Sequence, residues 1–121
     1  MASHRITLAD DDNDALFLLT RLLSRIYPDS SISTFTNAGD ALSHISQSDT
    51  DILITNHGMG EMSGTELVSE LRRKGCNIPI IMVSGNPAAR AEAIAAGANV
   101  FLEKSMSMDT VEREVRRLLK D

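Results

Sequence analysis

The sequence predicts an α/β fold in which one parallel sheet carries helices on both faces. Short apolar runs alternate five times with segments of helical spacing, and turn or cap signals separate them. Such alternation implies right-handed crossover connections between the strands and a parallel sheet with helices on both faces. The 121 residues accommodate one such five-fold repeat and contain no Ser/Gly/Pro-rich linker or internal repeat. We therefore expect residues 1–121 to form a single domain without an output module.

Five apolar runs are the candidate strands. Three of them, with the sequences ILIT, IIMVS and VFL, are nearly continuous, as strands that are buried on both faces tend to be. The predicted strands span Ile6–Ala9, Ile32–Phe35, Ile52–Thr55, Ile80–Ser84 and Val100–Leu102.

The first two helices are predicted from spacing and caps. In the first, apolar residues recur three and four positions apart, and Pro28 ends the helix. In the second, Asn37 followed three residues later by Asp40 predicts a capped helix over Ala38–Ser46. The apolar face of the first helix comprises Leu16, Leu19, Leu22, Leu23 and Ile26.

The third helix has the clearest start signal. Ser63 and Glu66 have the S-x-x-E spacing of a capping box, which predicts a helix over Thr65–Lys74 that Gly75 ends.

The last two helices are predicted from a proline, a glycine and an acidic start. Asn86 precedes Pro87 as a cap precedes a first-turn proline, and Gly97 ends that helix. The final helix begins at Asp109, and its apolar face comprises Val111, Val115, Leu118 and Leu119.

Composition excludes several classes of function. With 17 acidic and 12 basic residues the net charge is −5, which argues against nucleic acid or an anionic membrane as the partner. No apolar run approaches the roughly 20 residues of a membrane span. A single cysteine, Cys76, cannot form an internal disulfide, which favours a reducing, cytoplasmic compartment.

Polar side chains follow four of the predicted strands. In a doubly wound sheet the carboxyl ends of the strands lie at one edge, where ligands bind. An acidic cluster, a hydroxyl and a lysine at this edge suit a divalent cation and a phosphoryl group. The segments concerned are Asp10–Asp14, Asn56–Gly64, Ser84–Asn86 and Glu103–Ser105.

Motifs for other chemistries are incomplete. The D-x-D-x-D spacing from Asp10 is that of an EF-hand, but Ala15 and Arg21 occupy its glycine and glutamate positions. The glycines after the third strand do not have dinucleotide-binding spacing, and Ser84 lacks the G-x-S-x-G context of a hydrolase. We expect His57 to be an exposed loop side chain, and we expect no enzymatic activity.

Together these features resemble the receiver domain of two-component response regulators over the whole chain. The resemblance rests on the acidic pair Asp10 and Asp11, on Gly64, on Ser84 and on Lys104, each at the end of the appropriate strand or loop. The stretch M-G-E-M-S-G is similar to the family's M-P-x-M-x-G. The resemblance implies a flavodoxin-like (βα)5 fold with a doubly wound, five-stranded parallel sheet.

The main departure from the family is at Asn56. The family has an aspartate there, which accepts phosphate from a histidine kinase, whereas an amide cannot form an acyl phosphate. The resemblance implies Mg²⁺ ligation by Asp10, Asp11 and the Gly58 carbonyl. Losing one carboxylate weakens this ligation, because two charges 4 Å apart interact by about 4 kcal/mol at an effective dielectric near 20. The implied phosphate-binding and switch positions are Ser84, Phe101 and Lys104.

Two further departures lie in loops. Ser105 follows Lys104 where the family has proline, often after a cis bond, and a non-proline cis bond costs about 2.5–4 kcal/mol. We therefore expect a trans bond there. Gly60 replaces the proline of the loop after the third strand. Departures from the family pattern at three positions, Asn56, Gly60 and Ser105, indicate natural divergence of the sequence.

The sequence thus predicts a pseudo-receiver that has lost aspartyl phosphorylation and acts through protein contacts. Its partner would be a histidine kinase or an output protein. A homodimer could form through the helix after Pro87, the strand Val100–Leu102 and the final helix. One alternative is a phosphorylation-competent receiver, in which the acceptor was substituted or Asp10 or Asp11 accepts phosphate instead. A small-molecule-binding module that uses the same rim is a third interpretation.

Overall fold

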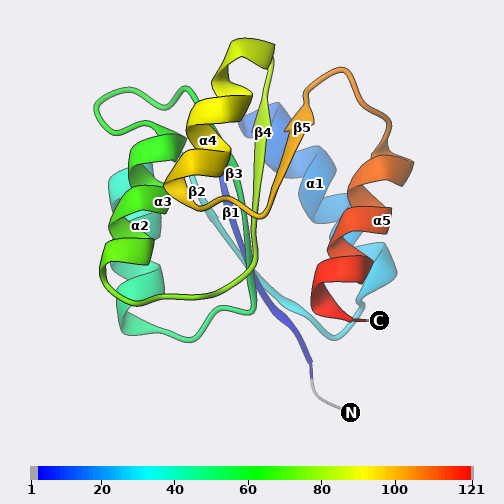
Figure 1. Cartoon of the computed structure of the whole chain (residues 1–121). Coiled ribbons are helices and arrows are strands. Elements are labelled where there is room, and N and C mark those ends of the chain that lie inside the picture. Colours follow the sequence, from blue (N-terminus) through cyan, green and yellow to red (C-terminus); the bar gives the residue numbers. More distant parts are fainter. Residues whose placement is uncertain (1–2, 121) are drawn as a thin grey trace.

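Five parallel strands form the centre of the fold, in the order β2-β1-β3-β4-β5 (Figure 1). This computed structural model describes residues 3–120. The chain passes from β1 outward to β2 and then crosses to β3 on the other side of β1, so the sheet is doubly wound and the expected flavodoxin-like fold class is confirmed. The strands are β1 (Arg5–Ala9), β2 (Ser31–Phe35), β3 (Ile52–Asn56), β4 (Ile80–Ser84) and β5 (Val100–Glu103).

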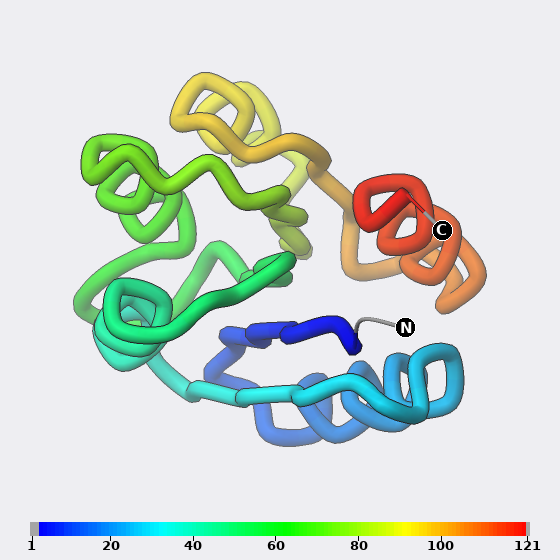
Figure 2. Tube along the Cα trace, turned by 90° about the horizontal axis from the view of Figure 1, so that it is seen from below, coloured from blue at the N-terminus to red at the C-terminus, as the bar shows by residue number. Residues whose placement is uncertain are grey.

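Helices cover both faces of the sheet (Figure 2). Buried side chains of α1 and α5 pack with one face, and those of α2, α3 and α4 pack with the other. A short 3₁₀ turn over Pro87–Ala89 precedes α4. The helices are α1 (Asn13–Ile26), α2 (Ala38–Gln47), α3 (Gly64–Arg73), α4 (Arg90–Ala96) and α5 (Met108–Leu119).

The central strand β3 supplies both apolar cores. All five of its residues are buried, and successive side chains of a strand point to opposite faces. Leu53 therefore lies in the core beneath α2, α3 and α4, whereas Ile52 and Ile54 lie in the core beneath α1 and α5. This burial on both faces explains the continuous apolar run in the sequence.

The capping box of α3 is present. The Ser63 hydroxyl accepts from the Glu66 N–H at 3.1 Å, and the Glu66 carboxylate accepts from the Ser63 N–H at 2.9 Å. The helix begins at Gly64, one residue before the predicted start.

The predicted start of α5 at Asp109 is one residue late. The helix begins at Met108, because the hydroxyl of Ser107 accepts from the Thr110 N–H and makes Ser107 the N-cap. Within residues 3–120, no helix is both long and apolar enough to cross a membrane.

The two loop departures from the family pattern, at Ser105 and Gly60, are visible in the backbone conformation. The Lys104–Ser105 bond is trans, as expected, and no cis bond occurs elsewhere among residues 3–120. Gly60 has a φ of +73°, which proline cannot adopt because its ring fixes φ near −65°. The loop after β3 therefore follows a path that a proline at this position would not allow.

Candidate functional site at the carboxyl edge of the sheet

Asp10 is the buried acid of the site. It follows β1 and is only 4% exposed. One carboxylate oxygen accepts from the Asp12 N–H at 3.0 Å, and the other accepts from Lys104 Nζ at 3.3 Å. Burial, together with the nearby charge of Asp11, raises the pKa of the Asp10 carboxyl, and these two contacts offset the rise only in part.

Lys104 and Ser84 lie together because β4 and β5 end side by side. The Lys104 N–H donates to the Ser84 carbonyl at 3.0 Å. The Ser84 hydroxyl is buried and accepts from the Asn86 N–H at 3.0 Å. In this arrangement the hydroxyl stabilises the turn that follows β4.

Asn56, the last residue of β3, links the acidic side of the site to the loop that follows it. Its amide nitrogen donates to the Gly58 carbonyl at 2.8 Å and, more weakly, to the Asp11 carboxylate at 3.4 Å. The side chain is nine-tenths buried, and its carbonyl oxygen accepts no hydrogen bond from the part of the chain that the structure describes. Asn56 thus bridges two oxygens through its donor and leaves its own acceptor available.

The loop after β3 is closed by hydrogen bonds to His57. The Gly64 N–H donates to the His57 carbonyl at 2.7 Å, and the His57 ring nitrogen Nδ1 lies 3.0 Å from the Thr65 hydroxyl. The expectation of an exposed His57 is therefore wrong: the ring is half-buried, because the return of the chain into α3 brings Thr65 against it.

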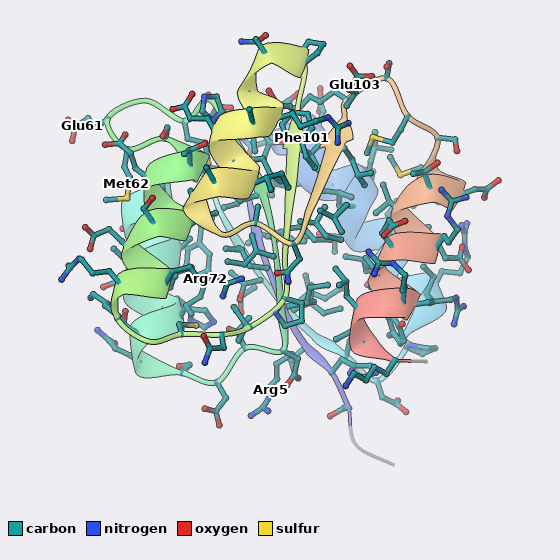
Figure 3. All side chains as sticks on the ribbon, in the orientation of Figure 1. Arg5, Glu61, Met62, Arg72, Phe101 and Glu103 are labelled. Carbon is teal, nitrogen blue, oxygen red and sulfur yellow. The ribbon has the colours of Figure 1, made fainter. Side chains whose placement is uncertain are left out.

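Phe101 does not reach the site. Its ring is 3% exposed and packs in the core beneath α4 (Figure 3). The Arg90 guanidinium lies 5.0 Å from the ring centroid. The contact of a guanidinium with an aromatic face is favourable, so Arg90 stabilises the buried position of Phe101.

Three of the predicted site residues share one cavity. A cavity of about 220 Å³ opens at this edge, and Asp10, Asn56 and Lys104 contribute to its lining. Asp11 and Gly58 join the site through Asn56, and Ser84 adjoins it through Lys104.

The oxygens that a cation would use at this site are engaged by an amide. The Asn56 nitrogen donates to both the Asp11 carboxylate and the Gly58 carbonyl, which a metal ion would need as free acceptors. Across residues 3–120, no group of three or more His, Cys, Asp or Glu side chains is arranged to hold a metal. A cation at these two oxygens would compete with the Asn56 amide for them.

Sequence reasoning missed the apolar walls of the cavity. They come from strand ends, from α1, from Met106 before α5 and from Met108 at the start of α5, and Leu18 and Met108 are both exposed. Leu18 is an apolar residue outside the apolar stripe that predicted α1, and this exception is a sequence signal for an apolar surface there. The apolar lining residues are Ala9, Ala15, Leu18, Leu19, Ile54, Val83, Met106 and Met108.

The fold and this edge define a doubly wound α/β domain with an acid, an amide and a lysine where its strands end. The profile of the response regulator receiver domain family matches residues 6–116, and the chain belongs to that family. Receiver domains are signal-receiving modules of two-component systems that typically bind Mg²⁺ for phosphorylation, contact histidine kinases and output domains, and are in general not catalysts.

Individual relatives agree with this membership. The response regulator TodT of Pseudomonas putida is 35% identical over 118 residues, which are 95% of this chain and 51% of TodT. A protein-glutamate methylesterase/protein-glutamine glutaminase of a Nocardioides species is 29% identical over 98% of this chain and 33% of its own length. A solved receiver domain protein from Methanospirillum hungatei superposes with a TM-score of 0.89 at 21% identity, over 98% of this chain and 95% of the other. The chain spans about half or less of the curated relatives it matches first.

Proposed function

We propose that this receiver domain has lost aspartyl phosphorylation and acts through protein contacts. The observation that carries the proposal is Asn56 at the carboxyl end of β3, where its amide donates to Asp11 and Gly58. Residues 1–121 then form one pseudo-receiver domain, which works in the cytoplasm and has no catalytic activity of its own.

The chemistry of the amide supports this proposal. Forming an acyl phosphate requires a carboxylate oxygen that attacks phosphorus, and Asn56 has no such nucleophile. A carboxylate in its place could not donate to the Gly58 carbonyl or the Asp11 carboxylate. Mg²⁺ would have to displace the amide from these oxygens, so its binding by Asp10, Asp11 and Gly58 is weak or vestigial.

The residues at the family's switch positions all make contacts within the protein. The Ser84 hydroxyl accepts a backbone N–H, Lys104 contacts Asp10, and Phe101 is covered by Arg90. With no phosphoryl group to rearrange these contacts, the conformation is set by the sequence or by a partner, since only a ligand that binds two states differently can shift their populations.

The partner surface in this proposal is the face made by α4, β5 and α5. On α4, Ile94 is 45% exposed, and the small exposed side chains of Ala91 and Ala95 allow close approach. We propose a histidine kinase, an output protein or a second copy as the partner on this face, and neither nucleic acid nor a membrane.

Phosphotransfer provides the test. The protein is incubated with Mg²⁺ and acetyl phosphate, and its intact mass is measured. We expect no phosphoryl adduct on the unaltered chain and a stoichiometric adduct on Asn56→Asp. Asn86→Asp is the matched control, because it adds a carboxylate at the same edge in an N-cap position that accepts aspartate equally well.

The same experiment distinguishes the alternative receiver. An adduct on the unaltered protein that Asp10→Asn or Asp11→Asn abolishes would show that a neighbouring carboxylate accepts phosphate and would overturn the proposal. An adduct on Asn56→Asp alone would show that the rest of the site remains competent.

A further inference from the structure

The outward face of α1 carries two large apolar side chains that the fold leaves uncovered. Phe17 is 60% exposed and Leu18 is 54% exposed, and α1 lies at the periphery of the molecule (Figure 2). The buried leucines of α1 pack into the core on the other side of the helix, so the outward pair is additional to them. A contiguous exposed apolar patch is typical of a surface that another protein covers.

Charged side chains flank this apolar pair along the same face of α1. Asp14 precedes Phe17 by three residues and Arg21 follows it by four, which are the spacings of neighbours on one helical face. The Arg21 guanidinium lies 5.7 Å from the centroid of the Phe17 ring. Arg25 lies one turn beyond Arg21, and all these charged side chains are exposed. The outward face of α1 is thus acidic near its amino end, apolar in the middle and basic near its carboxyl end.

The charges on this face have no partners of opposite sign in the part of the chain that the structure describes. Asp14, Arg21 and Arg25 make no ion pair there. Arg21 and Arg25 also stand four residues apart on the helix, where like charges repel. In α5, by contrast, Arg116 and Arg117 each pair with a glutamate of their own helix. An oppositely charged surface from outside would therefore satisfy both ends of the α1 face.

The order of the residues on this face is self-complementary. Asp14 and Arg21 are equally distant, by about 5 Å along the helix, from the midpoint between Phe17 and Leu18. A two-fold axis through that midpoint, perpendicular to the helix, makes a second copy of α1 antiparallel to the first. Asp14 of each copy then lies level with Arg21 of the other, and Phe17 lies level with Leu18. Packed helices lie about 8–10 Å apart, a gap that aspartate and arginine side chains can span together.

We infer that this chain forms a symmetric dimer in which the α1 helices of two copies pack antiparallel. Phe17 and Leu18 form the apolar centre, and two pairs of Asp14 with Arg21 flank it. The occupant is a second copy because the chain itself supplies both the acid and the base that the two ends of the face require.

The dimer surface on α1 is separate from the face made by α4, β5 and α5. A kinase or an output protein can therefore contact that face while the dimer is intact. The inference does not depend on the loss of phosphorylation, since neither Asn56 nor Mg²⁺ takes part in the pairing. Dimerisation and the phosphoryl adduct thus succeed or fail separately.

Sedimentation equilibrium of the purified chain measures the association. The patch is smaller than the roughly 800 Å² per partner of a standard interface, so we expect a dissociation constant on the order of 10⁻⁴ M. Leu18→Gln should weaken the dimer at least tenfold, because a substitution acts twice in a two-fold interface. Ile94→Gln is the matched control, an equal change at the exposed apolar residue of α4, and should leave the dissociation constant unchanged.

Exchanging charges tests the antiparallel pairing itself. Asp14→Arg sets arginine against arginine across the axis, and Arg21→Asp sets aspartate against aspartate, so each variant alone should dimerise at least tenfold more weakly. An equimolar mixture of the two variants restores opposite charges at both ends and should associate about as strongly as the unaltered chain.

Glu92→Arg and Lys74→Asp are the controls for the charge exchange. They make the same changes of net charge at exposed positions outside α1, and each should dimerise as the unaltered chain does. Thermal denaturation verifies that every variant is folded, and Leu18→Gln keeps the test decisive if a charge variant is not.

Three results would overturn the inference. The first is a chain that stays monomeric up to about 1 mM, which would assign the patch to a different protein. The second is a dimer that Ile94→Gln dissociates and Leu18→Gln does not. The third is a mixture of the two charge variants that associates no better than either variant alone.

Discussion

The burial of the Asp10 carboxylate is an unfavourable electrostatic feature of the site. Burial raises its pKa in the folded state, so protonation favours folding. The contribution of this carboxyl to the free energy of unfolding is therefore fully present below its unfolded pKa, where the carboxyl is protonated. This contribution is lost as the pH rises through the raised folded pKa. We expect Asp10→Asn to raise the free energy of unfolding by about 1 kcal/mol at pH 7, measured by urea denaturation.

Exposed Asp29 provides the control for this prediction, because Asp29→Asn removes the same charge without altering a buried group. A loss of stability in Asp10→Asn would mean that the pairing with Lys104 outweighs the burial of the carboxylate.

Gly64 is required because the chain passes very close to the end of β3. A Cβ at this position would overlap the Asn56 carbonyl oxygen and lie 3.0 Å from the Met82 sulfur. We expect Gly64→Ala to lower the free energy of unfolding by about 2–4 kcal/mol, since backbone must move to accept the methyl group. Gly58→Ala is the control, because its Cβ would meet no atom within 4 Å. Equal stability of the two variants in thermal denaturation would contradict the steric argument.

At the scale of elements, Arg72 connects the ends of α3 and α4. Its guanidinium donates twice to the Gly97 carbonyl, at 3.1 and 3.0 Å, and once each to the Cys76 carbonyl at 2.8 Å and the Asn99 side chain at 3.0 Å. We expect Arg72→Ala to lower the free energy of unfolding by about 2–3 kcal/mol, because several carbonyls lose a charged donor together.

Two further variants test this geometry in urea denaturation. Arg72→Lys should recover only part of the loss, because an ammonium lacks the planar fork of the guanidinium. Arg73→Ala, at an exposed neighbour, should change stability by less than about 0.5 kcal/mol. Full recovery by lysine would show that charge alone matters.

The starts of β1 and β3 are joined by Arg5 and Asp51, at the end of the sheet opposite Glu103 (Figure 3). Burial alone would raise the pKa of the Asp51 carboxyl, but hydrogen bonds from the Arg5 side chain and N–H, with its charge, leave the pKa below its ordinary value of 3.8. The stabilisation is therefore present above pH 3.8 and is lost as the pH falls through the lowered folded pKa.

We expect Asp51→Asn to lower stability at pH 7 by less than about 1 kcal/mol, because the pair is partly exposed. The difference between the two proteins should shrink as the pH falls from 3.8 through the lowered folded pKa of Asp51. Urea denaturation of both proteins across this range measures it. A difference that is constant with pH would show that the ionised carboxylate contributes nothing beyond its shape.

Sequence reasoning predicted the elements well because their signals are local. The continuous apolar run of β3 and the capping box at Ser63 each depend on a few neighbouring residues, and both are present. The start of α5 was misplaced because Ser107 competes with Asp109 for the cap, and only the backbone path decides between them.

The site was only partly predictable, because its contacts join distant segments. The positions of Asp10, Asn56 and Lys104 at one edge followed from topology, and they do line one cavity. The direction of the Asn56 amide depends on how the next loop folds back. The covering of Phe101 by Arg90 likewise depends on the packing of α4 against β5.

At the scale of the whole molecule, β3 joins two apolar cores that lie on opposite faces of the sheet. Losing this strand would expose both cores at once, so its amides should exchange with solvent only through global unfolding. The edge strand β2 has no fully buried residue and pairs with β1 alone. Its amides can open locally.

We therefore expect native-state hydrogen exchange to give the Leu53, Ile54 and Thr55 amides the full free energy of unfolding found by denaturation. The Ser33 and Phe35 amides of β2 should exchange with a free energy at least about 1 kcal/mol smaller. Because Ser84 and Lys104 are already engaged, Mg²⁺ and acetyl phosphate should leave this order and these values unchanged. Slower exchange at the ends of β4 and β5 after phosphodonor treatment would show instead that the edge still responds to a phosphoryl group.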